Sequence, residues 1–259
     1  MSTTELERSV VEPLDADDAS IAYAAASEAG RELLSLGSGF IWGEALGKAG
    51  DRLSHEILCA RLVAARPSDA ILSEEASDDP TRIHRDRVWI IDPLDGTREF
   101  GEPGRTDWAV HVALVCEQRL SMGVVALPAR GRIFTSAEPP PLPARSGPLR
   151  IVVSRTRPPA IAFEVARRLE AQLIPMGSAG AKAMSILLGE SDVYLHAGGQ
   201  YLWDSAAPVA VARAAGLHAS RLDGSPLLYN LHPAWQPDLL IARPELAQRV
   251  LEAVRESSQ

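Results

Sequence analysis

The spacing of hydrophobic residues changes several times along this chain, and these changes restrict the folds open to it. Residues 15–36 and 51–65 carry apolar side chains at helical spacing, which predicts two amphipathic helices. The apolar runs that follow are short, rich in β-branched residues and bounded by turn residues, as strands are. They lie at 70–73, 88–91, 108–115 and 122–127. The first half of the chain is therefore predicted to form an α+β domain.

A proline-dense stretch separates this half from the rest. Residues 138–148 read EPPPLPARSGP, and no regular helix or strand runs through such a sequence. Beyond it, predicted strands at 149–153 and 192–195 alternate with predicted helices at 159–171, 181–188 and 205–215. This alternation favours an α/β arrangement. We therefore expect an N-terminal domain over residues 1–140 and a C-terminal domain over residues 148–259.

The chain is acidic, and this narrows the range of its partners. Its 34 Asp and Glu residues against 26 Lys and Arg residues give a net charge of −8. A nucleic-acid polymer is a poor partner for such a protein, because that binding rests on neutralising phosphates with a basic surface. An acidic protein that handles small phosphorylated molecules needs metal ions to offset its own carboxylates.

Hydropathy and cysteine usage lead to expectations about location. The longest apolar stretches are far short of the ~20 residues that a membrane-spanning helix needs. The first 20 residues carry acids instead of a basic segment followed by an apolar one, so we expect no export signal and a cytoplasmic protein. Cys59 and Cys116 have apolar neighbours, which predicts buried free thiols rather than a disulfide or a metal site.

The segment Trp89-Ile90-Ile91-Asp92-Pro93-Leu94-Asp95-Gly96-Thr97 has the clearest chemical meaning. An apolar strand delivers Asp92 at its end, and Pro93 with Gly96 predicts a turn that brings Asp95 back beside Asp92. Two carboxylates and the Leu94 carbonyl together suit a hard cation such as Mg²⁺. The alternative is a surface turn in which the aspartates accept hydrogen bonds from the backbone.

Two further acidic segments favour the metal site. Ile71-Leu72-Ser73-Glu74-Glu75 is again an apolar strand that ends in acids. In Tyr201-Leu202-Trp203-Asp204-Ser205-Ala206-Ala207, an Asp opens an alanine-rich helix. Asp204 alone would suit a helix N-cap. Ser205 could cap the helix equally well, which would leave Asp204 free for another task.

Together these segments resemble the lithium-sensitive, Mg²⁺-dependent phosphatase superfamily. The superfamily includes inositol monophosphatases, fructose-1,6-bisphosphatases and the CysQ-type phosphatases of 3′-phosphoadenosine 5′-phosphate. The motifs stand in this chain as Glu74-Glu75, Asp92-Pro93-Leu94-Asp95-Gly96-Thr97 and Trp203-Asp204-Ser205-Ala206-Ala207. The resemblance implies a layered αβαβα sandwich, with the active site between the two halves.

The resemblance also implies which residues bind Mg²⁺. Glu74, Asp92 and the Leu94 carbonyl would hold one ion, and Asp92, Asp95 and Asp204 a second. Glu75 would help to hold a third, weaker one. The family pattern therefore implies two or three ions per site, with water as the nucleophile and no covalent phosphoenzyme.

The water-activating residues implied by the resemblance are Glu74, Thr97 and an Asp that pairs with Thr97. The best match for that Asp is Asp51. Here the chain departs from the family, whose upstream segment reads Val-Thr-x-Ala-Asp, because this chain has Gly47-Lys48-Ala49-Gly50-Asp51. Lys48 stands in this segment, either near a substrate phosphate or in solvent.

Substrate contacts are implied for a set of residues around these motifs, namely Leu94, Asp95, Gly96, Thr97, Ser178, Lys182 and Asp204. The backbone N–H groups of Gly96 and Thr97 would receive the phosphate, as helix N-termini do for anions. Ser178 and Lys182 resemble the segment that lines the family's substrate pocket. In the alternative reading, Ser178 caps the helix that follows, and Lys182 extends from its first turn into solvent.

Details of three segments are more similar to the CysQ branch than to the inositol branch. These are Arg98-Glu99-Phe100, Ser154-Arg155 and Asp223-Gly224-Ser225-Pro226-Leu227-Leu228-Tyr229-Asn230. They favour 3′-phosphoadenosine 5′-phosphate, cleaved to AMP and phosphate in a step linked to sulfate assimilation. Inositol 1-phosphate and fructose 1,6-bisphosphate are the alternatives within the same chemistry. A metal or nucleotide sensor without activity is the alternative outside it.

Other features carry less weight. Gly43-Glu44-Ala45-Leu46-Gly47-Lys48-Ala49 looks like a P-loop but has the wrong spacing and lacks the Mg²⁺-binding Ser or Thr. The six histidines are scattered singly, so each is expected to be hydrogen-bonded in the fold or exposed. Because dimers are common among soluble enzymes, we expect a homodimer.

Overall fold

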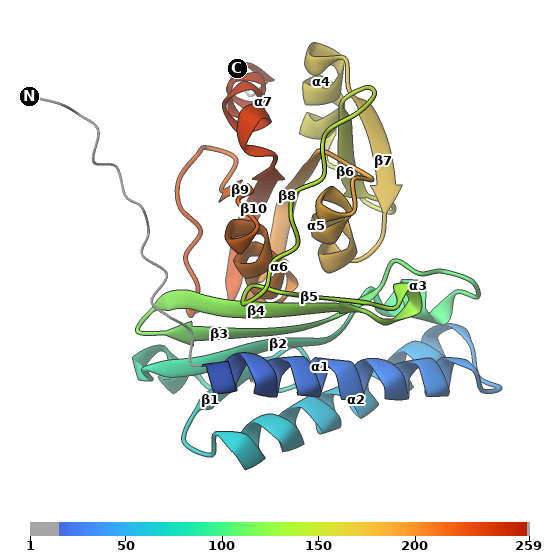
Figure 1. Cartoon of the computed structure of the whole chain (residues 1–259), viewed down its shortest axis with the longest axis vertical. Helices are drawn as coiled ribbons and strands as arrows, with labels where there is room; N and C mark the ends of the chain where they lie inside the picture. Colours follow the sequence, from blue (N-terminus) through green and yellow to red (C-terminus); the bar gives the residue numbers. More distant parts are fainter. Residues whose placement is uncertain (1–15, 258–259) are drawn as a thin grey trace, which may run out of the picture.

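The computed structural model describes residues 16–257, in five alternating layers of helices and sheets (Figure 1). Helices α1 (Ala16–Gly37) and α2 (Gly43–Ala65) pack side by side and form the first layer. Their apolar faces cover one side of a five-stranded sheet. Its strands, in spatial order, are β1 (Ala70–Ser73), β2 (Arg87–Asp95), β3 (Ala109–Cys116), β4 (Arg119–Leu127) and β5 (Arg132–Thr135).

A second five-stranded sheet lies in the other half of the chain. Its strands, in spatial order, are β7 (Gln172–Met176), β6 (Arg150–Ser154), β8 (Val193–Tyr201), β10 (Trp235–Ala242) and β9 (His218–Ser220). Helices α5 (Ala179–Leu187) and α6 (Leu202–Ala214) lie between the two sheets, and α4 (Ala160–Leu169) and α7 (Pro244–Ser257) cover the outer face of the second sheet (Figure 1).

This arrangement confirms the predicted αβαβα sandwich. Three hydrophobic cores separate the layers, and the largest of them surrounds α5 and α6. Short connections complete the first half: the 3₁₀ turns Pro80–His84 and Pro128–Arg130, and α3 (Thr97–Gly101) directly after β2. The proline-dense residues 138–148 contain no helix or strand. No helix within residues 16–257 is long and apolar enough to span a membrane.

The predicted elements differ from the observed ones in several places. Helix α2 begins eight residues before the predicted start at Asp51, because the glycine-rich segment from Gly43 is helical despite its low helix propensity. Strands β5, β7, β9 and β10, helix α7 and the two 3₁₀ turns were not predicted. Residues 1–15 lie outside the described residues. They include residue 15, where the first helix was predicted to begin, the start of the predicted N-terminal domain and most of the acidic first 20 residues.

Strand β2 contains an irregularity that decides where its acids point. Asp92 pairs with His111 and Asp95 with Ala109, so three steps along β2 match two along β3, as in a β-bulge. Side chains three apart on a regular strand face opposite sides of the sheet. The bulge restores a common side for Asp92 and Asp95, while Leu94 packs against α1 and α2. The predicted convergence of the two aspartates is therefore real, but a bulge produces it instead of a turn after the strand.

Candidate active site

Asp92, Asp95 and His111 form a buried cluster at the bulge. Each offers one ligand atom, and these atoms lie within 4.8 Å of one another, a group that could hold a metal ion. Asp92 Oδ1 accepts a hydrogen bond of 3.1 Å from the Leu94 backbone N–H, whereas Oδ2 is buried and has no partner in the described part of the chain. Burial, followed by the charge of Glu74, raises the pKa of Asp92 well above its usual range. A buried carboxylate oxygen without a donor suits a cation.

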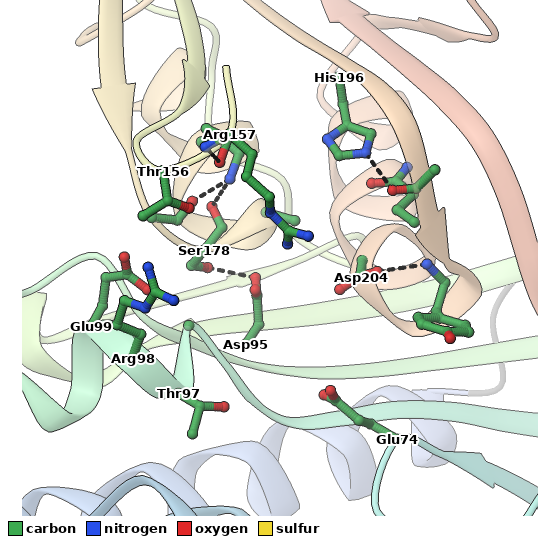
Figure 2. A pocket seen from close by; sticks show the side chains of 18 of the residues that line it. Glu74, Asp95, Thr97, Arg98, Glu99, Thr156, Arg157, Ser178, His196 and Asp204 are labelled. Atoms are coloured by element: carbon green, nitrogen blue, oxygen red, sulfur yellow. Dashed lines mark hydrogen bonds between the residues drawn. The ribbon is translucent and has the colours of Figure 1, made fainter. Parts of the chain in front are cut away.

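Asp95 is held in one orientation by the middle layer. Its Oδ2 accepts hydrogen bonds from the Ser178 hydroxyl at 2.5 Å and from the Gly180 N–H at 2.7 Å. Gly180 lies in the first turn of α5, where backbone N–H groups have no partner within the helix. The same oxygen lies 3.2 Å from His111 Nε2, so these contacts hold Asp95 against the cluster. Figure 2 shows the Ser178 hydroxyl beside the Asp95 carboxylate.

His111 is fully buried on β3 and connects two acidic segments. Its Nδ1 lies 3.1 Å from the Trp203 carbonyl oxygen, which can only accept, so Nδ1 carries a proton. Its Nε2 lies 3.2 Å from Asp95 Oδ2 without forming a hydrogen bond. Burial lowers the pKa of His111, against the opposing charge of Asp95. The sequence did not indicate that His111 lies at the site, because the histidines are scattered singly along the chain.

Asp204 reaches the site from α6. The helix begins at Leu202, earlier than predicted, and Asp204 Oδ2 accepts a hydrogen bond of 2.7 Å from the Tyr201 N–H in a capping box. The alternative that Ser205 caps the helix is wrong, because Ser205 is buried inside it and its hydroxyl accepts from Gln236 Nε2 at 2.5 Å. Burial, then the charge of Asp95, raises the pKa of Asp204 to about 7.

Glu74 approaches from the loop after β1. The side chain is exposed toward the pocket, but its carboxylate faces the acids across from it (Figure 2). The solvation lost there, followed by the charge of Asp204, raises the pKa of Glu74 to about 8. Burial and, after it, the charges of the neighbouring carboxylates both disfavour the ionised form of these acids. A bound cation would relieve this repulsion.

Thr97 and Asp51 are hydrogen-bonded, as predicted for the pair. Thr97 Oγ1 lies 3.1 Å from Asp51 Oδ1 and also 3.1 Å from the Leu94 carbonyl oxygen. Gly47, one helical turn before Asp51, permits this approach, because a Cβ there would lie 2.6 Å from Thr97 Cγ2. Burial and the charge of Glu75 raise the pKa of Asp51 to about 6. The structure therefore brings Asp51 to Thr97 without the family's upstream Thr.

Ser178 and Lys182 line the same pocket, and each has other partners. The Ser178 hydroxyl accepts from Ala181 N at 2.9 Å as the N-cap of α5. Lys182 is buried, and its ammonium donates to the carbonyl oxygens of Gly177 and Ser178 and lies 5.2 Å from the centre of the Tyr194 ring. Their contact with substrate stays a prediction.

Three side chains singled out in the sequence lie outside the acidic pocket, although Lys48 borders a smaller cavity with Asp51 and Glu75. Lys48 is exposed and pairs with Glu44 at 2.6 Å. Cys59 and Cys116 are free thiols, as predicted, but each is only half-buried. Burial raises the pKa of both.

The acids open into a pocket of about 840 Å³ between the two halves, a size typical of small-molecule sites. Its floor holds Glu74, Asp95 and Asp204, and Gly96 and Thr97 lie at its edge (Figure 2). Arg98 and Arg157 also line it, as do the aromatic side chains of Tyr201 and Trp235. Sequence reasoning did not identify Arg157, because a single arginine in a loop has no distinguishing pattern.

The CysQ-like segments meet across the two halves. Arg155, after β6, donates to Glu99 on α3 at 2.6 Å and to Glu102 at 3.0 Å. Asn230 accepts at 2.8 Å from the buried guanidinium of Arg82, which follows the Glu74 loop. These contacts join the C-terminal half to the loops that carry the acids.

Comparison with known proteins decides the family. The sequence model described as the inositol monophosphatase family matches residues 19–259. The chain belongs to the inositol monophosphatase family. Within that family, it is 51% identical over 244 residues to the 3′-phosphoadenosine 5′-phosphate phosphatase of Mycobacterium tuberculosis, covering 89% of this chain and 90% of that protein.

Two more similar proteins agree with this placement, and the second is described as a bacterial member of the inositol monophosphatase family. The 3′(2′),5′-bisphosphate nucleotidase CysQ of Escherichia coli is 32% identical over 197 residues, covering 70% of this chain and 78% of that protein. The crystal structure of CysQ from Bacteroides thetaiotaomicron superposes with a TM-score of 0.77 at 26% identity, covering 88% of this chain and 97% of that one. Both sequence and fold therefore group the chain with these proteins.

Proposed function

We propose that this protein is a Mg²⁺-dependent phosphomonoesterase that removes the 3′-phosphate of 3′-phosphoadenosine 5′-phosphate and yields AMP and phosphate. The observation that carries the proposal is that Glu74, Asp95 and Asp204 line one pocket, that Asp92 is buried beside Asp95, and that Thr97 in the same pocket is hydrogen-bonded to Asp51. The names of the relatives support the nucleotide substrate.

The donor set fits Mg²⁺. Glu74, Asp92 and the Leu94 carbonyl would hold one ion, and Asp92, Asp95 and Asp204 a second. The partnerless Asp92 Oδ2 and the raised pKa values of the surrounding carboxyls support this assignment. Hard oxygen ligands of this kind suit Mg²⁺. Glu75, whose charge acts on Asp51, would help with a third ion.

When bound, Mg²⁺ supplies charge neutralisation at the phosphate and lowers the pKa of the attacking water. The residues of the chain do the rest. The Thr97 hydroxyl donates its hydrogen bond to Asp51 Oδ1, so that the hydroxyl oxygen can accept a hydrogen bond from the water. The Glu74 carboxylate is a second acceptor, on the pocket floor. The backbone N–H groups of Gly96 and Thr97, at the start of α3, receive phosphate oxygens.

A phosphate-release assay at equal concentrations of three substrates tests the proposal. We expect 3′-phosphoadenosine 5′-phosphate to be hydrolysed faster than inositol 1-phosphate and fructose 1,6-bisphosphate, and only with Mg²⁺ present. Faster hydrolysis of one of the two alternatives would identify that compound as the preferred substrate, with the same chemistry. No release from any of the three would leave the sensor as the remaining reading.

Further proposals concern the protein as a whole. We propose that residues 138–148 mark the boundary between domains 1–140 and 148–259, and that the protein works in the cytoplasm as a homodimer. Limited proteolysis with mass spectrometry would find the boundary at an early cut within 138–148. Analytical ultracentrifugation gives the oligomeric state, and a monomer would contradict the last proposal.

A further inference from the structure

The pocket contains cations that the reaction at the acids does not use. A bisphosphorylated substrate carries one phosphate that reacts and one that does not. The acidic floor repels the second phosphate, so its binding needs a cationic group that is not already paired. Three cationic side chains line the pocket, namely Arg98, Arg157 and Lys182.

Lys182 is a poor anchor for that phosphate. Its buried ammonium already donates to two carbonyl oxygens and lies against Tyr194, which accounts for its donors. A neighbouring cation outside this set, Arg155, is occupied by Glu99 and Glu102. Arg98 and Arg157 remain, and within residues 16–257 neither guanidinium forms an ion pair.

Arg157 is the better placed of the two. It lies in the loop between β6 and α4, where its backbone N–H donates to Ser154 Oγ at 3.2 Å and shapes the turn. Figure 2 shows its side chain extending over the pocket above Asp95, on the opposite side from Glu74. Its charge also contributes, after burial and Lys182, to the lowered pKa of His196, which lines the same pocket.

Aromatic side chains also line the pocket. Tyr201 stacks on Trp203 with ring centres 4.6 Å apart and planes at 9°, and it is half exposed. Trp235 is also half exposed and lines the pocket beside Gly199. A flat base can lie against such a surface, as single-stranded nucleotides do on aromatic side chains. This arrangement favours a nucleoside bisphosphate over a sugar bisphosphate.

We propose that the Arg157 guanidinium binds the second, non-reacting phosphate of a nucleoside bisphosphate, and so makes the enzyme prefer it to the monophosphate. This inference rests on the proposed function. Arginine suits the task, because its planar donors match phosphate oxygens two at a time. The acids then receive the reacting phosphate while Arg157 holds the other end of the substrate.

The test compares two substrates that differ only in that phosphate. In R157A, kcat/KM for 3′-phosphoadenosine 5′-phosphate should fall by about 10- to 100-fold, the worth of a charge-assisted hydrogen bond. The loss for adenosine 3′-phosphate should be much smaller, and R157K should keep part of the preference. R167A, an exposed arginine on α4 that pairs with Glu164, is the matched control and should behave as wild type.

Equal losses on both substrates, or no loss on the bisphosphate, would overturn the assignment. A selective loss in R98A and none in R157A would give the subsite to Arg98. Binding of AMP, compared with adenosine by titration calorimetry, tests the same contact without turnover. If the wild type hydrolyses neither substrate, the proposed function fails, while weaker AMP binding by R157A still supports the subsite and unchanged binding refutes it.

Discussion

Thr97 Oγ1 and Asp51 Oδ1 lie 3.1 Å apart, although the residues stand 46 positions apart in the sequence and belong to different helices. The Thr97 hydroxyl has one proton and two acceptors within reach, Asp51 and the Leu94 carbonyl. Above its pKa of about 6, Asp51 is ionised and is the stronger acceptor. The pair can therefore turn a lone pair of the hydroxyl oxygen toward a water molecule.

If the pair acts as a unit, T97A and D51N should each lower kcat by about 10²- to 10⁴-fold, the usual contribution of a positioned acid–base group. The double variant should lose little more, because residues that act together are not additive. T97S, which keeps the hydroxyl, serves as the control. Steady-state kinetics at saturating Mg²⁺ would contradict the pairing if D51N turned over like wild type while T97A was inactive.

Asp92→Asn should abolish turnover, because it removes a charge shared by both proposed ion sites while keeping the side-chain shape. It should not lower the melting temperature in EDTA, since it removes a buried carboxylate charge that has too few partners. The stabilisation on adding Mg²⁺ should vanish. Differential scanning fluorimetry measures both effects, with the exposed Asp86→Asn as control. A normal Mg²⁺ response in Asp92→Asn would refute the ligand assignment.

His111→Ala should weaken Mg²⁺ binding by about 10- to 100-fold, the usual loss when a residue that supports a metal ligand is removed. The His111 ring lies beside Asp95, and its removal leaves the Trp203 carbonyl without a donor. His111→Asn, which keeps an N–H donor, should recover part of the affinity. Activity titrated against Mg²⁺ separates the affinity change from kcat, and an unchanged titration would limit His111 to packing.

Metal-free protein should lose stability as pH rises from about 4 to about 8. Folded Glu74 and Asp204 have pKa values of about 8 and about 7, whereas unfolded carboxyls titrate near ~4. Between these limits the folded state binds more protons, so the free energy of unfolding falls with pH. The gain in melting temperature on adding Mg²⁺ should grow over the same range. Asp204→Asn should flatten the EDTA profile, and a flat wild-type profile would contradict the raised pKa values.

Lithium should inhibit turnover. Li⁺ is close in size to Mg²⁺ but carries one charge, so at the site of Asp92, Asp95 and Asp204 it would hold the product without supporting release. Inhibition at millimolar Li⁺ should persist as substrate rises. Initial rates over a grid of Li⁺ and substrate test this, and competition with substrate would argue against that position for the ion.

Local patterns in the sequence were enough to find the acids. Glu74, Asp92 and Asp204 each follow or precede an apolar run, and the structure brings Glu74 and Asp204 into one pocket with Asp92 buried near them. The layered fold was also predictable, because three separated motifs occur in the family order. Their roles as ligands stay a prediction.

Contacts between the halves could not be predicted. His111 and Arg157 have ordinary neighbours in the sequence, and their positions depend on how α5, α6 and the β6–α4 loop pack on the first sheet. β10 was missed for a local reason, since Pro237 and a register shift interrupt its apolar pattern. The start of α2 was missed because glycines at 43, 47 and 50 weaken the helical signal.

The bulge in β2 determines the sequence spacing that the two aspartates would need if the site were built into another sheet. On a regular strand, two acids with Asp-x-x-Asp spacing would point to opposite faces, one toward α1 and α2 and one toward α6. The same pair of aspartates on a strand without a bulge would require Asp-x-Asp spacing instead. Deleting Pro93 alone would regularise the strand and leave Asp92-Leu94-Asp95, so that both acids would keep a common face without the bulge.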